Sequence, residues 1–129
     1  LKPKFALVAA LVMSTPAGAY EIVAGTRDGS ALVGRSSKGG TAVPVGIWLR
    51  PAVKGVRLTA KVRTNAKSVE VTLRTSTNRA SRVAAIARDG RIEIELPAGE
   101  AIEEVTFTPS IESKSARPWI ELEAIEVVR

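Results

Sequence analysis

Three groups of residues in this sequence could do chemistry: paired carboxylates, a serine-rich loop with a lysine, and two tryptophans. Glu103-Glu104 and Glu93/Glu95 are carboxylate pairs, the groups with which glycosidases flank a scissile bond. Carboxylates spaced in this way are also commonplace on the solvated face of a strand. The loop SSKGG, residues 36–40, lacks the Gly-x-x-x-x-Gly-Lys-Ser/Thr order of a phosphate-binding loop. Neither group therefore indicates a catalytic site.

The 129 residues include no cysteine and no histidine. Their absence excludes disulfides, Cys/His zinc sites, cysteine nucleophiles and acid–base pairs built on histidine. A hydrolase would have to use two carboxylates or a Ser/Lys pair. We therefore predict that the protein is not an enzyme.

The two tryptophans offer a different chemistry, the stacking of a flat apolar ring. In TAVPVGIWLRP, Trp48 is out of phase with the apolar residues on either side, and in PWIELEAIEVV the same holds for Trp119. An exposed Trp can stack on a sugar ring while polar neighbours bind its hydroxyls. The alternative is that the rings cover a sheet edge or fill a subunit contact. The predicted ligand-binding residues are Trp48, Trp119, Arg50, Arg117 and Glu121.

The elements that would position these residues are strands. Apolar and polar residues alternate along most of the chain after residue 19, a period of two that is typical of strands with one buried face. Turn residues around Asn65, and the pair Asp89-Gly90, predict hairpins joining residues 56–62 to 69–73 and 82–88 to 92–96. Further strands are expected at 20–24, 31–34, 43–49, 105–107 (stopped by Pro109) and 120–128. About eight or nine strands at this spacing predict an all-β antiparallel sandwich as a single domain over residues 20–129.

The first 19 residues have a different pattern. Lys2 and Lys4 precede a nine-residue apolar run from Phe5 to Met13, and Ala17-Gly18-Ala19 supplies the small residues that a signal peptidase reads. This pattern predicts a signal peptide, and with it a secreted, periplasmic or cell-surface protein. The run is too short for a membrane-spanning helix, which needs about 20 apolar residues. The alternative is a strand or helix retained at the start of the fold.

The charges are unevenly distributed along the chain. Residues 20–91 contain 14 Lys/Arg and 4 Asp/Glu, whereas residues 92–129 contain 3 and 9. If basic strands lie beside acidic ones, such as 57–63 beside 93–95 or 121–123, this asymmetry is cross-strand pairing. If they lie apart, a basic end and an acidic end would favour head-to-tail self-association or docking on an acidic polymer. Nucleic acid is not predicted as a partner, because the basic residues are spread out and have no aromatics between them.

The order of GVRLTAKVRTNAKSVEVTLRT, GRIEIELPAGEAIEEVTFTPS and ARPWIELEAIEVVR resembles the second half of a galactose-binding-like β jelly roll, the fold of many carbohydrate-binding modules. The resemblance covers roughly residues 43–129 and includes no diagnostic motif. It implies no cofactor other than a structural calcium near the chain ends, for which Glu21, Asp28 and Glu126 are candidates by location only. Calcium requires six to eight oxygen ligands, and three scattered carboxylates do not supply them.

Two functional hypotheses follow from the sequence. The first is an exported, non-catalytic module that binds a glycan or cell-surface polysaccharide through the tryptophans. The alternative is a structural subunit of a surface layer, filament or shell, joined to its copies by strand addition and complementary charge.

Overall fold

The computed structural model describes residues 5–10, 19–29, 31–35, 44–110 and 118–128, and every regular element in them is a β-strand. No helix occurs in these ranges, and hence none that could cross a membrane. The strands are β1 (Phe5–Ala10), β2 (Ala19–Ala24), β3 (Thr26–Asp28), β4 (Ala31–Arg35), β5 (Val45–Val53), β6 (Arg57–Thr64), β7 (Ser68–Thr75), β8 (Arg79–Ala85), β9 (Arg91–Glu95), β10 (Ile102–Ser110) and β11 (Trp119–Val128).

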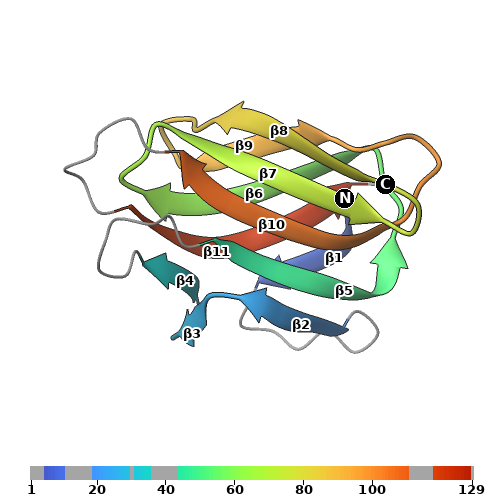
Figure 1. Ribbon diagram of the computed structural model, residues 1–129, viewed down its shortest axis with the longest axis horizontal. Coiled ribbons are helices and arrows are strands. Elements are labelled where there is room, and N and C mark those ends of the chain that lie inside the picture. Colours follow the sequence, from blue (N-terminus) through green and yellow to red (C-terminus); the bar gives the residue numbers. More distant parts are fainter. Residues whose placement is uncertain (1–4, 11–18, 30, 36–43, 111–117, 129) are drawn as a thin grey trace.

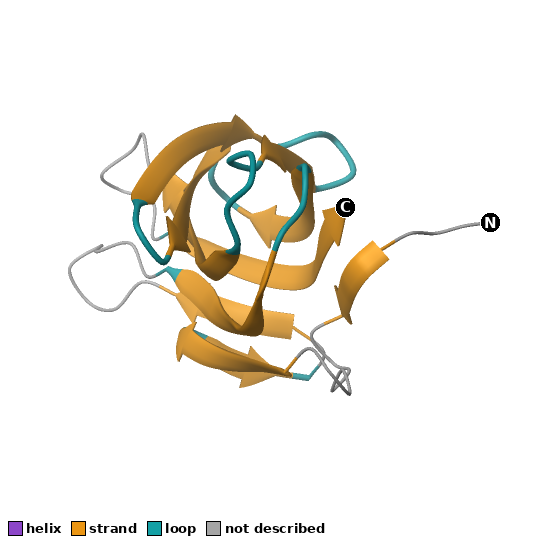
Figure 2. Cartoon of the chain, turned by 90° about the vertical axis from the view of Figure 1, so that its right-hand side faces the viewer, coloured by secondary structure: helices purple, strands orange, loops and turns teal. Residues whose placement is uncertain are grey.

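The strands form two antiparallel sheets that face one another (Figure 1). One is a five-stranded sheet in the order β2-β5-β10-β7-β8. The other has six strands in the order β3-β4-β11-β6-β9, and β1 pairs with the second half of β11. The view in Figure 2, turned by 90°, shows the sheets curling around a common interior. The predicted all-β sandwich is therefore confirmed.

The interior is filled by the apolar residues of the alternating patterns. Phe107 on β10 is fully buried, as are Ile47 and Leu73 from its two neighbours in the five-stranded sheet. The six-stranded sheet contributes Leu58 and Leu122 among others from the opposite side. Each of these residues lies in a strand whose next residue points away from the core, as the period of two requires. Their burial, driven by the hydrophobic effect, holds the two sheets together.

The two halves of the charge asymmetry meet within the six-stranded sheet. The basic strand β6 lies between β9 and β11, which both carry carboxylates on their outward faces. Arg57 lies opposite Glu95 on β9, and Arg63 lies opposite Glu121 on β11. Of the two alternatives that the sequence left open, the six-stranded sheet therefore has the first, in which basic strands lie beside acidic ones.

Both predicted hairpins are wrong. β6 belongs to the six-stranded sheet and β7 to the five-stranded sheet, so the residues around Asn65 carry the chain from one layer to the other. The turn at Asp89-Gly90 exists, with the Gly90 N–H donating to Ala87 O at 2.8 Å, but it too joins two layers, β8 and β9. Alternation shows that a strand has one buried face. It cannot show which sheet the strand joins, because both sheets cover the same core.

Four further details differ from the sequence prediction. Val56 is 63% exposed rather than part of the buried face of β6. β10 does not stop at Pro109, which lies opposite Val69, although its pairing with β5 ends at Phe107. Pro109 therefore has a partner strand on one side only, a position that tolerates the missing N–H. β3 was not predicted, and the strand predicted at 82–88 is found at Arg79–Ala85.

The apolar N-terminal run contributes one strand. β1 pairs antiparallel with β11, with Ala10 opposite Ala124 and Phe5 opposite Val128. Signal-peptide cleavage of residues 1–19 stays a prediction.

Candidate functional site

The first tryptophan lies in a row of side chains that crosses the outer face of the five-stranded sheet. Cross-strand register places Trp48 between Glu21 on β2 and Glu104 on β10, and the row continues to Arg74 on β7 and Arg79 on β8. With strands about 4.8 Å apart, this row is about 19 Å long. Trp48 is partly buried, whereas Ile47 and Leu49 on either side are fully buried. The predicted outward direction of the ring is confirmed.

Arg50 covers the ring of Trp48. Its guanidinium carbon lies 3.9 Å from the ring centroid, a cation–π contact between residues two apart on β5. Arg50 Nε also lies 3.0 Å from Glu21 Oε1, and the two side chains are 49% and 57% exposed. An exposed ion pair of this kind is weak. Arg50 therefore occupies the surface on which a planar ligand would stack, but it is held there only loosely.

A second arginine, Arg74 on β7, approaches the same ring along the row, from the side of β10. Arg74 Cζ lies 5.9 Å from the Trp48 centroid, and Arg74 Nη2 lies 3.3 Å from Glu104 Oε1. The Arg74 Nε–H is buried and has no acceptor among the described residues. A buried donor without a partner is destabilising. Arg74 is thus fixed by its ion pair with Glu104 through Nη2, while its buried Nε–H lacks a hydrogen bond.

Hydroxyl groups form the neighbouring row on this face. Thr106 on β10 lies opposite Thr72 on β7, which lies opposite Ser81 on β8. The Thr72 and Ser81 hydroxyl oxygens are 2.9 Å apart and hydrogen-bonded, and either can donate. One aromatic ring, several charged groups and a row of hydroxyls are what a surface needs to stack on a sugar and bind its hydroxyls.

The second tryptophan lies on the other sheet. Trp119 begins β11, and its backbone is tied to the end of β6: the Thr64 hydroxyl donates to Trp119 O at 2.6 Å, and Trp119 N–H donates to Asn65 Oδ1 at 3.1 Å. Glu121, two residues on, lies opposite Arg63. The structure therefore brings Trp48 and Arg50 together and places Trp119 and Glu121 together in the other layer. Arg117 lies outside the described residues.

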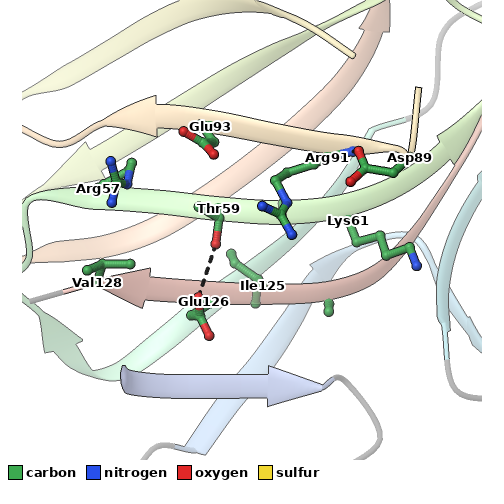
Figure 3. Close-up of a pocket in the computed structure, with 11 residues that line it drawn as sticks. Arg57, Thr59, Lys61, Asp89, Arg91, Glu93, Ile125, Glu126 and Val128 are labelled. Atoms are coloured by element: carbon green, nitrogen blue, oxygen red, sulfur yellow. Dashed lines mark hydrogen bonds between the residues drawn. The ribbon is translucent and has the colours of Figure 1, made fainter. Parts of the chain in front are cut away.

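A groove of about 460 Å³ crosses the outer face of the six-stranded sheet (Figure 3). It runs over β9, β6 and β11, and Thr59 on its floor donates to Glu126 Oε1 at 3.4 Å. Cationic and acidic side chains line it in equal number, and none of the described lining residues is aromatic. The groove offers hydrogen bonds but no stacking surface. Its charged lining residues are Arg57, Lys61, Arg91, Asp89, Glu93 and Glu126.

The calcium candidates do not form a group. Glu21 lies on β2 of the five-stranded sheet, where it pairs with Arg50, whereas Asp28 and Glu126 lie on strands of the six-stranded sheet. Within the described ranges, no three acidic side chains come close enough together to hold a metal ion.

Comparison with solved structures identifies the architecture. A mutant of a carbohydrate-binding module of family 29 superposes with a TM-score of 0.59 over 93% of this chain and 90% of that chain, at 10% identity. A mutant of such a module in complex with cellulohexaose gives 0.59 over 93% and 89%, at 8% identity. Another, in complex with mannohexaose, gives 0.56 over 86% and 81%, at 9% identity. The chain therefore has a β-sandwich fold like that of these modules. No protein-family model and no curated protein matches the sequence.

The carbohydrate-binding-module fold confirms the resemblance found in the sequence, and its coverage extends beyond the predicted second half. Sequence reasoning missed three residues around Trp48, however. The sequence offers Glu21 only as a calcium ligand and Glu104 only as part of a carboxylate pair, and it does not single out Arg74 at all. The signal that could have found them is the register between β5, β10 and β7, which local sequence patterns do not contain.

Proposed function

We propose that this chain is an exported, non-catalytic module that binds a glycan on the outer face of its five-stranded sheet. The observation that carries the proposal is Trp48. It is a partly buried ring on an outward face, in a row with four charged side chains and next to a row of hydroxyls. Similar folds solved in complex with cellulohexaose and mannohexaose support this reading.

The proposal places the stacking surface at Trp48 rather than at Trp119. Trp48 lies within a row that spans all five strands, so a ligand bound there contacts side chains on both sides of the ring. Trp119 lies at the first residue of its strand, and its backbone bonds to Asn65 and Thr64 give it a role in closing the sandwich. Nothing in the described residues or in the comparisons favours the alternative of a self-assembling surface subunit.

Two matched variants test the proposal. Isothermal titration would measure binding of cellulohexaose, mannohexaose and their acidic analogues to the wild type, Trp48→Ala and Trp119→Ala. We expect Trp48→Ala to weaken binding by about 30-fold or more, the effect of losing a contact worth about 2 kcal/mol, while Trp119→Ala retains it. Thermal unfolding of both variants checks that the fold persists. Loss of binding in Trp119→Ala alone would place the site on the other sheet, and no binding of any glycan by the wild type would refute the proposal.

A further inference from the structure

We infer that the glycan bound at Trp48 is acidic, a chain of hexuronic acids whose carboxylates pair with the arginines around the ring. The inference rests on the proposed function and names the substrate class for the same site. We call the row Glu21, Trp48, Glu104, Arg74 and Arg79 the Trp48 row. The evidence is the number of arginines in or next to this row, and the N–H donors that their ion pairs with carboxylates leave unused.

The first observation is a like-charge pair. Arg79 on β8 lies directly opposite Arg74 on β7, and cross-strand neighbours of the same charge destabilise a sheet. Arg74 is paired with Glu104, but no ion pair connects Arg79 to any described residue. The Trp48 row, with Arg50 above it, thus contains three arginines and two carboxylates. An anion bound beside Arg79 would offset the repulsion between Arg74 and Arg79.

The second observation is how each paired arginine is held. Arg50 contacts Glu21 through Nε, and Arg74 contacts Glu104 through Nη2, one nitrogen in each case. A guanidinium has five N–H donors and binds carboxylates best through two parallel bonds. The two carboxylates that would repel an anion, Glu21 and Glu104, are each already neutralised by one of these arginines. The carboxylate of a bound uronate can therefore accept hydrogen bonds from the N–H groups of Arg50 and Arg74 that their ion pairs do not use.

The third observation concerns access to the ring. Arg50 lies 3.9 Å from the Trp48 centroid, so any sugar that stacks on that surface must displace its guanidinium. A neutral sugar displaces it without compensation. A uronate gives the displaced guanidinium a new carboxylate partner at the edge of the ring, so the same movement forms a charge-assisted hydrogen bond. The arrangement discriminates against neutral chains by this difference.

The test compares two ligands that differ only at the carboxylate. Mannohexaose and the mannuronate hexamer of the same linkage are titrated into the wild-type protein at low and at moderate salt. We expect the mannuronate hexamer to bind at least about tenfold more tightly at low salt, and its advantage to shrink as salt screens the arginines. Equal or tighter binding of mannohexaose would overturn the inference and leave glycan binding intact. If neither hexamer, nor cellulohexaose, binds, the proposed function fails as well.

Matched variants locate the carboxylate. Arg79→Gln should weaken the mannuronate hexamer about fivefold and mannohexaose much less. Arg63→Gln, which removes an exposed arginine from the opposite sheet, should change neither ligand. A loss of mannuronate affinity in Arg63→Gln equal to that in Arg79→Gln would mean that overall charge, and not the Trp48 row, selects the ligand. That result would also overturn the inference.

Discussion

Removing the arginine that covers Trp48 should strengthen the binding of a neutral glycan. In the free protein the Arg50 guanidinium lies 3.9 Å from the ring centroid and Arg50 Nε lies 3.0 Å from Glu21. A cation–π contact at an exposed site contributes about 0.5–1 kcal/mol, and an exposed ion pair about 0.2–1 kcal/mol. Arg50 is 49% exposed, so we take about 1 kcal/mol for the sum. Arg50→Ala should therefore bind mannohexaose about fivefold more tightly than the wild type.

The same variant should have the opposite effect on an acidic ligand, because it removes a carboxylate partner. Titration calorimetry with mannohexaose and the mannuronate hexamer measures both effects. Glu21→Gln, which loosens Arg50 without removing it, should give a smaller gain for mannohexaose, and Arg63→Ala serves as the control on the other sheet. Weaker binding of mannohexaose by Arg50→Ala would refute the reasoning. It would mean that Arg50 donates hydrogen bonds to the sugar hydroxyls, as the sequence alone predicted.

Two predictions concern the scaffold. Gly90 and Gly99 both have positive φ, but a Cβ on Gly90 would lie 2.5 Å from Val62 O, whereas nothing lies within 4 Å of one on Gly99. Gly99→Ala should cost about 1–2 kcal/mol of backbone strain in urea unfolding, and Gly90→Ala clearly more; equal losses would show that the Val62 contact relaxes freely. Phe107→Ala should lower the free energy of unfolding by about 3–5 kcal/mol, because Phe107 is fully buried between the sheets. A loss below about 1 kcal/mol would mean that the core closes over the missing ring.

The burial of side chains could be predicted from the sequence, whereas the pairing of strands could not. Val69, Val71 and Leu73 face the core of the sandwich as their alternation predicted, and so do Ile92 and Ile94. The predicted partners of these strands were wrong. A short loop can turn back within one sheet or cross to the facing sheet, and the alternation of apolar and polar residues in the strands is the same in both cases.

The site was predictable to the same extent. Trp48 and Arg50 are neighbours along one strand, so their common face could be read from their spacing. Arg74 and Glu104 join them only through strand register, which relates residues far apart in the sequence. The sequence could not show whether Trp48 and Trp119 lie in one site, because this depends on the sheet to which each strand belongs. The structure places the two tryptophans in different sheets.

The position of β11 has a consequence for how the protein is made. The last strand of the described chain is an inner strand of the six-stranded sheet, and it pairs with β6, with β4 and with β1, the first strand. During synthesis the sheet therefore cannot be completed until residues 119–128 have left the ribosome. Loop closure over such sequence separations is slow, so we expect the six-stranded sheet to be completed late in folding. Deleting β11 should prevent the sandwich from forming. A substitution of an exposed residue on the edge strand β8, such as Arg82→Ala, should leave the free energy of unfolding nearly unchanged.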